Sequence, residues 1–97
     1  MVVVTTVTIA ATNTAQALSS TRIPANWITL QSDPANVDPT YHGPPNVTTV
    51  TGQVISVGGG GGSPQYPPVS DVSPYELSRI YVIGTEDDIV RVMYLTR

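Results

Sequence analysis

The sequence contains no cysteine and no lysine, and only 11% of its 97 residues are charged. The lack of cysteine excludes disulfide bonds and thiolate metal sites, and it leaves the redox compartment undetermined. An average soluble protein has about 25% charged residues, and such residues keep a free surface dispersed in water. We therefore expect other protein chains to cover much of the surface of this one.

Positively charged residues are few. Seven acidic residues outweigh four scattered arginines, which gives a formal net charge of -3. Nucleic-acid binding needs a basic stripe that meets the phosphates, so we expect no nucleic-acid partner. The chain also lacks any run that approaches the ~20 apolar residues of a membrane span, and we expect no membrane partner.

The N-terminal stretch MVVVTTVTIAATNTAQA is apolar and ends in Ala-Gln-Ala, which imitates a signal-peptidase site. A signal peptide begins with positive residues and continues with an uninterrupted apolar core. Here the first positive residue is Arg22, and threonines interrupt the apolar run. We therefore interpret residues 2–10 as a β-strand with apolar residues on one face and threonines on the other.

Strand signals recur along the chain at the spacing expected of sandwiches and barrels, whereas helix-forming residues gather only briefly. We expect an all-β fold in one domain, residues 1–97: a jelly-roll-like antiparallel β-sandwich of about eight short strands. The proline-rich segment 32–46 and the Gly/Pro-rich segment 58–68 are expected to be loops. The expected strands are residues 2–10, 16–23, 26–31, 47–51, 53–57, 69–72, 78–83 and 89–95.

The segment LSRIYVIGTEDDIVRVMYL, residues 77–95, is apolar on both faces of its two predicted strands. If residues 84–88 form the loop of a hairpin, Tyr81 lies opposite Arg91, where the two side chains can make a cation–π contact. The even-numbered residues Ile80, Val82, Val90 and Val92 are small and β-branched, which suits the core. The odd-numbered residues mix large apolar side chains with Arg and Tyr, which is typical of a protein–protein interface.

Two interpretations of this segment remain open. In one, the odd-numbered residues form the core and a loop covers the even-numbered face. We favour the other, in which a second chain covers the odd-numbered face. The strand at residues 2–10 would be an exposed apolar edge in a monomer, so we expect it to be exchanged or to pair with a sister subunit or a capsid arm. The expected subunit or capsid interface consists of Val2, Val3, Val4, Leu77, Arg79, Tyr81, Arg91, Met93 and Leu95.

Residues that could carry chemistry are few. His42 is the only histidine and has no second His or Cys with which to bind a metal. Asp33, Asp38 and the acidic run 86–88 lack the spacing of a calcium loop and are interpreted as turn formers. Trp27 is expected in the core, although an exposed Trp could stack on a sugar ring. We expect no catalytic residue, no cofactor, no metal and no enzymatic activity.

A resemblance to a known group lies in two stretches, RIPANWITLQSDPANVDP at residues 22–39 and VSDVSPYELSRIYVIGTEDDIVRVMYL at residues 69–95. Both are similar to short, cysteine-free, Thr/Val-rich virion proteins of tailed bacteriophages, some of which are capsid decoration, or cement, proteins. The order of the parts is similar too, from an N-terminal Val/Thr strand and the WITL strand to a Tyr-x-Gly loop and a Pro-Pro segment. The resemblance covers about two-thirds of the chain and fails at residues 44–46 and 58–62.

The resemblance implies a jelly-roll-like sandwich, commonly a homotrimer, on the outer capsid surface of the virion at threefold or quasi-threefold positions. There it would clamp neighbouring major capsid proteins against the internal pressure of the DNA. The two departures put loop-borne contacts of the relatives in doubt, but not the sandwich. The alternatives are another virion component, such as a head fibre, tail or receptor-binding part, and a carbohydrate-binding β-sandwich module.

Overall fold

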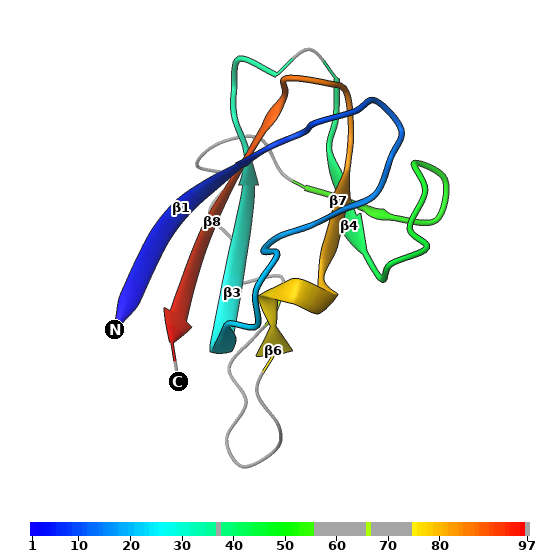
Figure 1. Ribbon diagram of the computed structural model, residues 1–97. Helices are drawn as coiled ribbons and strands as arrows, with labels where there is room; N and C mark the ends of the chain where they lie inside the picture. The colour runs from blue at the N-terminus through cyan, green and yellow to red at the C-terminus, as the bar shows by residue number, and fades with distance from the viewer. Residues whose placement is uncertain (37, 56–65, 67–74, 97) are drawn as a thin grey trace.

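The computed structural model describes residues 1–36, 38–55, 66 and 75–96. Two four-stranded antiparallel sheets pack against each other as a β-sandwich (Figure 1). The first sheet has the strand order β1-β8-β3-β6, and the second has the order β2-β7-β4-β5. The elements are β1 (Val2–Thr8), β2 (Gln16–Ala17), β3 (Pro24–Ser32), β4 (Tyr41–Gly43), β5 (Gln53–Val54), β6 (Tyr75–Glu76), the 3-10 helix η1 (Leu77–Arg79), β7 (Tyr81–Ile83) and β8 (Ile89–Thr96).

The strand pairing identifies the sandwich as a jelly roll. β1 pairs with β8, β2 with β7, β3 with β6 and β4 with β5, as in a ribbon folded in half on itself. Rolling that ribbon brings β8 beside β3 and β7 beside β4, and both pairs are present. Eight strands in two packed sheets of this kind make the jelly-roll architecture, so the predicted fold class is confirmed.

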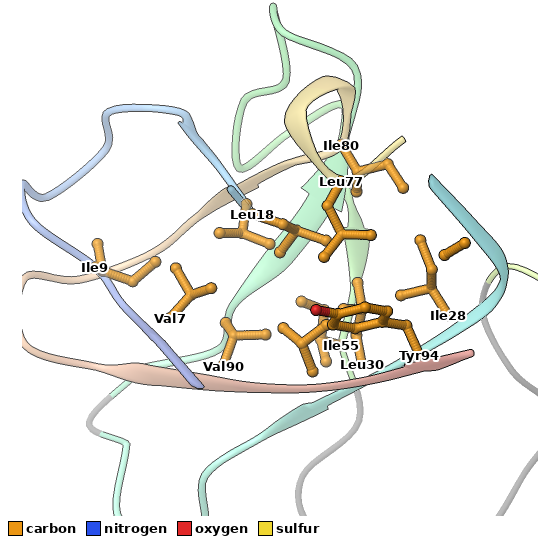
Figure 2. Packing of buried hydrophobic residues seen from close by; sticks show 13 residues of the cluster. Val7, Ile9, Leu18, Ile28, Leu30, Ile55, Leu77, Ile80, Val90 and Tyr94 are labelled. Atoms are coloured by element: carbon orange, nitrogen blue, oxygen red, sulfur yellow. The ribbon is translucent and has the colours of Figure 1, made fainter. Parts of the chain in front are cut away.

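The core fills the space between the two sheets (Figure 2). On β8 the inward residues Val90, Val92 and Tyr94 are buried and alternate with outward ones, because successive side chains of a strand point to opposite faces. Ile80 and Val82 belong to the same core cluster. The prediction that the small even-numbered residues of this segment face the core is therefore confirmed.

The predicted C-terminal hairpin is wrong. β7 and β8 belong to different sheets, and residues 84–88 carry the chain from one sheet to the other. Arg91 lies opposite Thr6 of β1 instead of Tyr81, so the predicted cation–π pair does not form. The reason is long-range pairing: β1 and β3 flank β8 along nearly its whole length and hydrogen-bond to both of its edges. A register drawn from neighbouring sequence alone contains neither of these partners.

Other predicted strands differ in their bounds. The segment 32–46 contains β4, and the segment 47–51 is a turn. In this turn Thr48 Oγ1 accepts hydrogen bonds from the backbone N–H groups of Val50 and Thr51, at 3.2 and 3.1 Å. Short hydroxyl side chains that bond to the nearby backbone compete with strand formation, which explains why this valine- and threonine-rich segment is not a strand.

Several predicted strands are shorter than expected, and two of them are much shorter. The strand expected at 16–23 is reduced to β2, and the strand expected at 78–83 is reduced to β7, with η1 before it. The strand expected at 69–72 and the loop expected at 58–68, except for Tyr66, lie outside the described residues. Among the described residues, no helix has the length and apolar character needed to cross a membrane.

Candidate protein-binding face

The outer face of the first sheet gathers exposed and half-buried apolar side chains from three strands. β8 lies between β1 and β3, and directly opposite residues of antiparallel strands share one face. The register therefore arranges the outward side chains in rows that cross the three strands. The first row lies at the end of the sheet where both chain termini are found (Figure 1). These rows are Val2–Leu95–Trp27, Val4–Met93–Thr29 and Thr6–Arg91–Gln31.

We call the first two rows the apolar patch: Val2, Val4, Trp27, Thr29, Met93 and Leu95. Val2, Val4 and Met93 expose 51%, 70% and 37% of their surface, and the other three are half-buried. By contrast, Val92, the inward neighbour of Met93, is only 1% exposed. No residue of the patch is charged. A contiguous exposed apolar surface of this kind is typical of an interaction site.

The valines and threonines of β1 explain how one strand supplies both faces. Both residue types are β-branched, which restricts the first side-chain torsion and favours extended backbone. Val3 and Val7 pack on or in the core, whereas Val2 and Val4 point outward. The N-terminal half of β1 therefore carries valine on both faces, whereas only threonines point outward in its C-terminal half.

An ion pair occupies the far end of this outer face. Arg91 Nη2 lies 3.0 Å from Asp33 Oδ2, and Asp33 Oδ1 accepts a hydrogen bond of 2.9 Å from the Ala35 N–H. The Ala35 N–H bond, followed by the Arg91 contact, holds the pKa of the Asp33 carboxyl below its usual value. Arg91 and Asp33 are thus paired with each other at the end of the face away from the apolar patch.

The structure brings a majority of the predicted interface residues onto this one face. They come from β1 and β8, two strands at opposite ends of the chain. Their common surface follows from the β1–β8 register. The residues that share the face are Val2, Val4, Arg91, Met93 and Leu95.

The remaining predicted interface residues lie elsewhere. Val3 packs against the core, and Leu77 is 1% exposed within it. Arg79 Nε lies 3.5 Å from Glu76 Oε2, next to the β6 edge, and Tyr81 belongs to the second sheet. Leu77, Arg79 and Tyr81 belong to the half of the predicted hairpin that the structure separates from β8, whereas Val3 is the inward-facing neighbour of Val2 and Val4 on β1.

Trp27 is on the outer face and not in the core as predicted. The register of β3 shifts between Ala25 and Trp27, so that Ala25 and Ile28 are both buried while Trp27 points outward opposite Leu95. Such a bulge redirects the side chains that follow it. The segment carries no glycine that would have indicated a bulge, so strand alternation alone could not place this residue.

A second cluster of polar and aromatic side chains lines a hollow of about 460 Å³ beside the second sheet. His42 is buried on β4, and its Nδ1 lies 2.9 Å from the Tyr66 hydroxyl. The two rings meet edge to face with centroids 5.3 Å apart, and Tyr66 meets Tyr75 in the same way. Burial lowers the pKa of His42 and raises the pKa of Tyr66, so both side chains are neutral at pH 7.

The histidine cluster links distant segments of the chain. His42 was predicted in a loop, as a surface or hydrogen-bonding residue; it lies on a strand and makes a hydrogen bond to an aromatic side chain. Nothing in the sequence around Tyr66 indicated this partner. Within the described parts of the chain, no three His, Cys, Asp or Glu side chains come together in a way that could hold a metal ion.

The acidic residues lie in turns, as predicted, and bind neighbouring loops. Thr85 Oγ1 donates a 2.8 Å hydrogen bond to Asp38 Oδ2, and the Asp38 N–H donates to Asp88 Oδ2 at 3.3 Å. The Glu86 N–H donates to Thr12 Oγ1 at 2.9 Å. These bonds connect segments 47 to 74 positions apart in the sequence, so the acids serve to close one end of the sandwich.

Comparison with protein-family models, with curated proteins and with solved structures finds no match to this chain.

Proposed function

We propose that this protein is a structural virion protein of the decoration, or cement, type. In this proposal it binds the outer surface of a phage head and stabilises contacts between major capsid proteins. The apolar patch carries the proposal, because it is a partly exposed, uncharged surface that spans three hydrogen-bonded strands. The resemblance of two stretches of the sequence to phage virion proteins supplies the capsid as the partner.

A decoration protein needs buried area and a rigid support more than it needs chemistry. Removing apolar surface from water contributes about 25 cal/mol per Å², and a standard interface buries about 800 Å² per partner. The patch would be the apolar centre of such an interface, and the polar row that contains Thr6 and Gln31 would lie at its rim. Many copies on one head would add avidity to weak individual contacts.

The substitution Met93→Glu tests the proposal at the middle of the patch. Met93 lies on the central strand, between Val4 and Thr29, so the new carboxylate would have no partner of opposite charge in its row. Burying it against a capsid would be costly, and heads should retain few copies of the variant. Copies per head would be measured by gel densitometry after undecorated heads are incubated with the protein and sedimented.

Val50→Glu is the matched control for this experiment. Val50 is 89% exposed in the turn between β4 and β5, next to the second sheet and not the first. It receives the same side chain as Met93→Glu and should be retained like the wild type. Retention of Met93→Glu at the wild-type level, with a circular dichroism spectrum that shows a folded protein, would contradict the proposal.

Copy number separates decoration from the other virion roles. A decoration protein is present many times on each head, whereas a tail or receptor-binding part is present a few times. Quantitative mass spectrometry of purified virions measures this ratio against the major capsid protein. A low copy number would favour the tail or receptor-binding role.

Trp27 provides the test against a carbohydrate-binding module. It lies in the apolar patch beside Leu95, so in our proposal it contacts protein. Stacking of a sugar ring on the indole would quench its fluorescence, and Trp27 is the only tryptophan in the chain. Saturable quenching by added glycans would favour the carbohydrate-binding alternative.

A further inference from the structure

Strand β1 has one edge beside β8 and one outer edge. A single side chain covers one end of this outer edge, and the rest of the edge is open. In an antiparallel ladder, the backbone groups of alternate residues point toward the neighbouring strand, and those between them point away. Met1 O accepts a hydrogen bond from the Thr96 N–H, and the Ile9 N–H donates to Asp88 O. The odd-numbered backbone groups of β1 thus face β8, and the even-numbered groups face the open edge.

The side chain of Gln16 covers the C-terminal end of this edge. Its Nε2 donates to Thr8 O at 3.1 Å, and its Oε1 accepts from the Ala10 N–H at 2.9 Å. The side-chain amide therefore takes the place that a neighbouring strand would take. Among the described strands none pairs with the other edge of β1, so the N–H and C=O groups of Val2, Val4 and Thr6 stay open to a partner.

Natural proteins protect open edges with charges, prolines, bulges or short strands. The opposite edge of the same sheet is β6, which has two residues, one of which, Glu76, pairs with Arg22 at 2.6 Å. The edge strands β2 and β5 of the second sheet also have two residues each. β1 has seven residues and contains no charge, no proline and no register shift. It is the one long unprotected edge among the described strands.

We propose that two copies of this chain associate by antiparallel pairing of their β1 edges about a two-fold axis at Val4. In this register Val4 lies opposite Val4 of the partner subunit, and Val2 lies opposite Thr6 of the partner subunit. Every open N–H and C=O group of Val2, Val4 and Thr6 then has a partner. The pairing joins two four-stranded sheets into one continuous sheet.

Gln16 determines this register. A shift of the partner toward Thr8 would place it against the carbonyl that Gln16 already holds. A shift in the other direction would leave the backbone groups of Thr6 unpaired. The register centred on Val4 is the one that uses all the open groups and stops where the glutamine begins.

The side chains of β1 suit a contact of the strand with its own copy. A two-fold contact sets the middle of the strand against itself, so a charge there would meet a like charge. β1 has no ionisable side chain, and its residues are valines and threonines, which form favourable cross-strand pairs. The pairing also continues the apolar patch across the axis, because Met93 and Val4 lie in one row.

The test uses the purified protein and no phage head, so it can succeed or fail independently of the proposed function. Sedimentation velocity over a roughly thousandfold range of concentration should show a monomer–dimer equilibrium for the wild type. Val4→Lys and Val4→Glu should each be monomeric, and an equimolar mixture of the two should dimerise. Val50→Lys, the control at an exposed valine outside the sheet, should associate like the wild type.

Val4→Pro distinguishes edge pairing from packing of the two apolar patches. Proline keeps an apolar side chain but removes an N–H that points to the open edge and not toward β8, so the fold should remain and the dimer should be lost. A wild type that is monomeric throughout, a trimer, or a Val4→Lys or Val4→Pro variant that dimerises like the wild type would overturn the proposal.

Discussion

β7 and β8 come from one apolar stretch, yet their outward residues have different surroundings. Ile83 on β7 is 3% exposed, whereas Met93 on β8 is 37% exposed. Ile83 lies opposite Tyr41, and Tyr41 shares a groove with Thr12 and Thr49 from two loops of the same chain. Ile83 is thus enclosed within its own chain, whereas Met93 is partly open to solvent. A strand that is apolar on both faces needs cover, but its sequence does not say whether that cover is internal.

Substitution of Ile83 tests this contrast and should have the largest effect on the free energy of unfolding. Ile83→Ala should lower the free energy of unfolding by about 2–5 kcal/mol, because it leaves a cavity at a buried position. Met93→Ala should lower it by less than about 1 kcal/mol, because the side chain is partly in water. Urea unfolding measures both values. Equal losses at the two positions would mean that Met93 is covered as completely as Ile83.

Gly52 tests the packing of the 44–52 turn next to β4 and β5. A Cβ at this position would lie 2.8 Å from Val47 Cγ2, 2.9 Å from Tyr41 Cβ and 3.0 Å from Thr48 O. Gly52→Ala should therefore lower the free energy of unfolding by about 1–3 kcal/mol, whereas Val50→Ala in the same turn should change it by less than about 0.5 kcal/mol. A neutral Gly52→Ala variant would show that the turn does not pack tightly.

The inner faces of the sheets differ as well, because the second contains His42. Burial lowers the pKa of His42 below its ordinary value of 6.5, so the unfolded chain takes up the proton first as the pH falls. Stability should therefore decrease from pH 7 to pH 5. His42→Gln keeps a hydrogen-bonding side chain without the titration, and its urea midpoint should depend less on pH over this range. The same pH dependence in both proteins would exclude His42 as its cause.

The smallest effect is expected at the Asp33–Arg91 ion pair. The pKa of Asp33 is lowered, so its stabilising contribution is present above 3.8 and is lost as the pH falls through the lowered pKa. Asp33→Asn keeps an acceptor for the Ala35 N–H and removes the charge. The melting temperature should fall slightly at low salt and hardly at all at high salt, since ions screen exposed pairs. A loss that is independent of salt would point to a role other than the ion pair.

Local patterns predicted much of the fold correctly. Alternation of β-branched residues located β1, β3 and β8, and the small even-numbered residues of the C-terminal segment were assigned to the core. β4 was missed because it has three residues within a proline-rich segment, too few for alternation to be visible. The turn at 47–51 was missed because Thr48 competes for the backbone hydrogen bonds.

The candidate site was harder to predict because it depends on pairing over long sequence distances. Val2 and Leu95 are adjacent only through the β1–β8 register, and Trp27 joins them only because of a bulge. The sequence indicated that Met93 and Leu95 needed a partner surface. It could not indicate that Leu77, from the same apolar stretch, would enter the core at the start of a 3-10 helix.

A reconstruction of phage heads decorated with this protein would show which face of the sandwich is seated on the capsid. We expect Val4, Met93 and Trp27 to lie against protein and the turn at 44–52 to face solvent. Density that places the outer face of β1, β8 and β3 in open solvent would contradict this expectation.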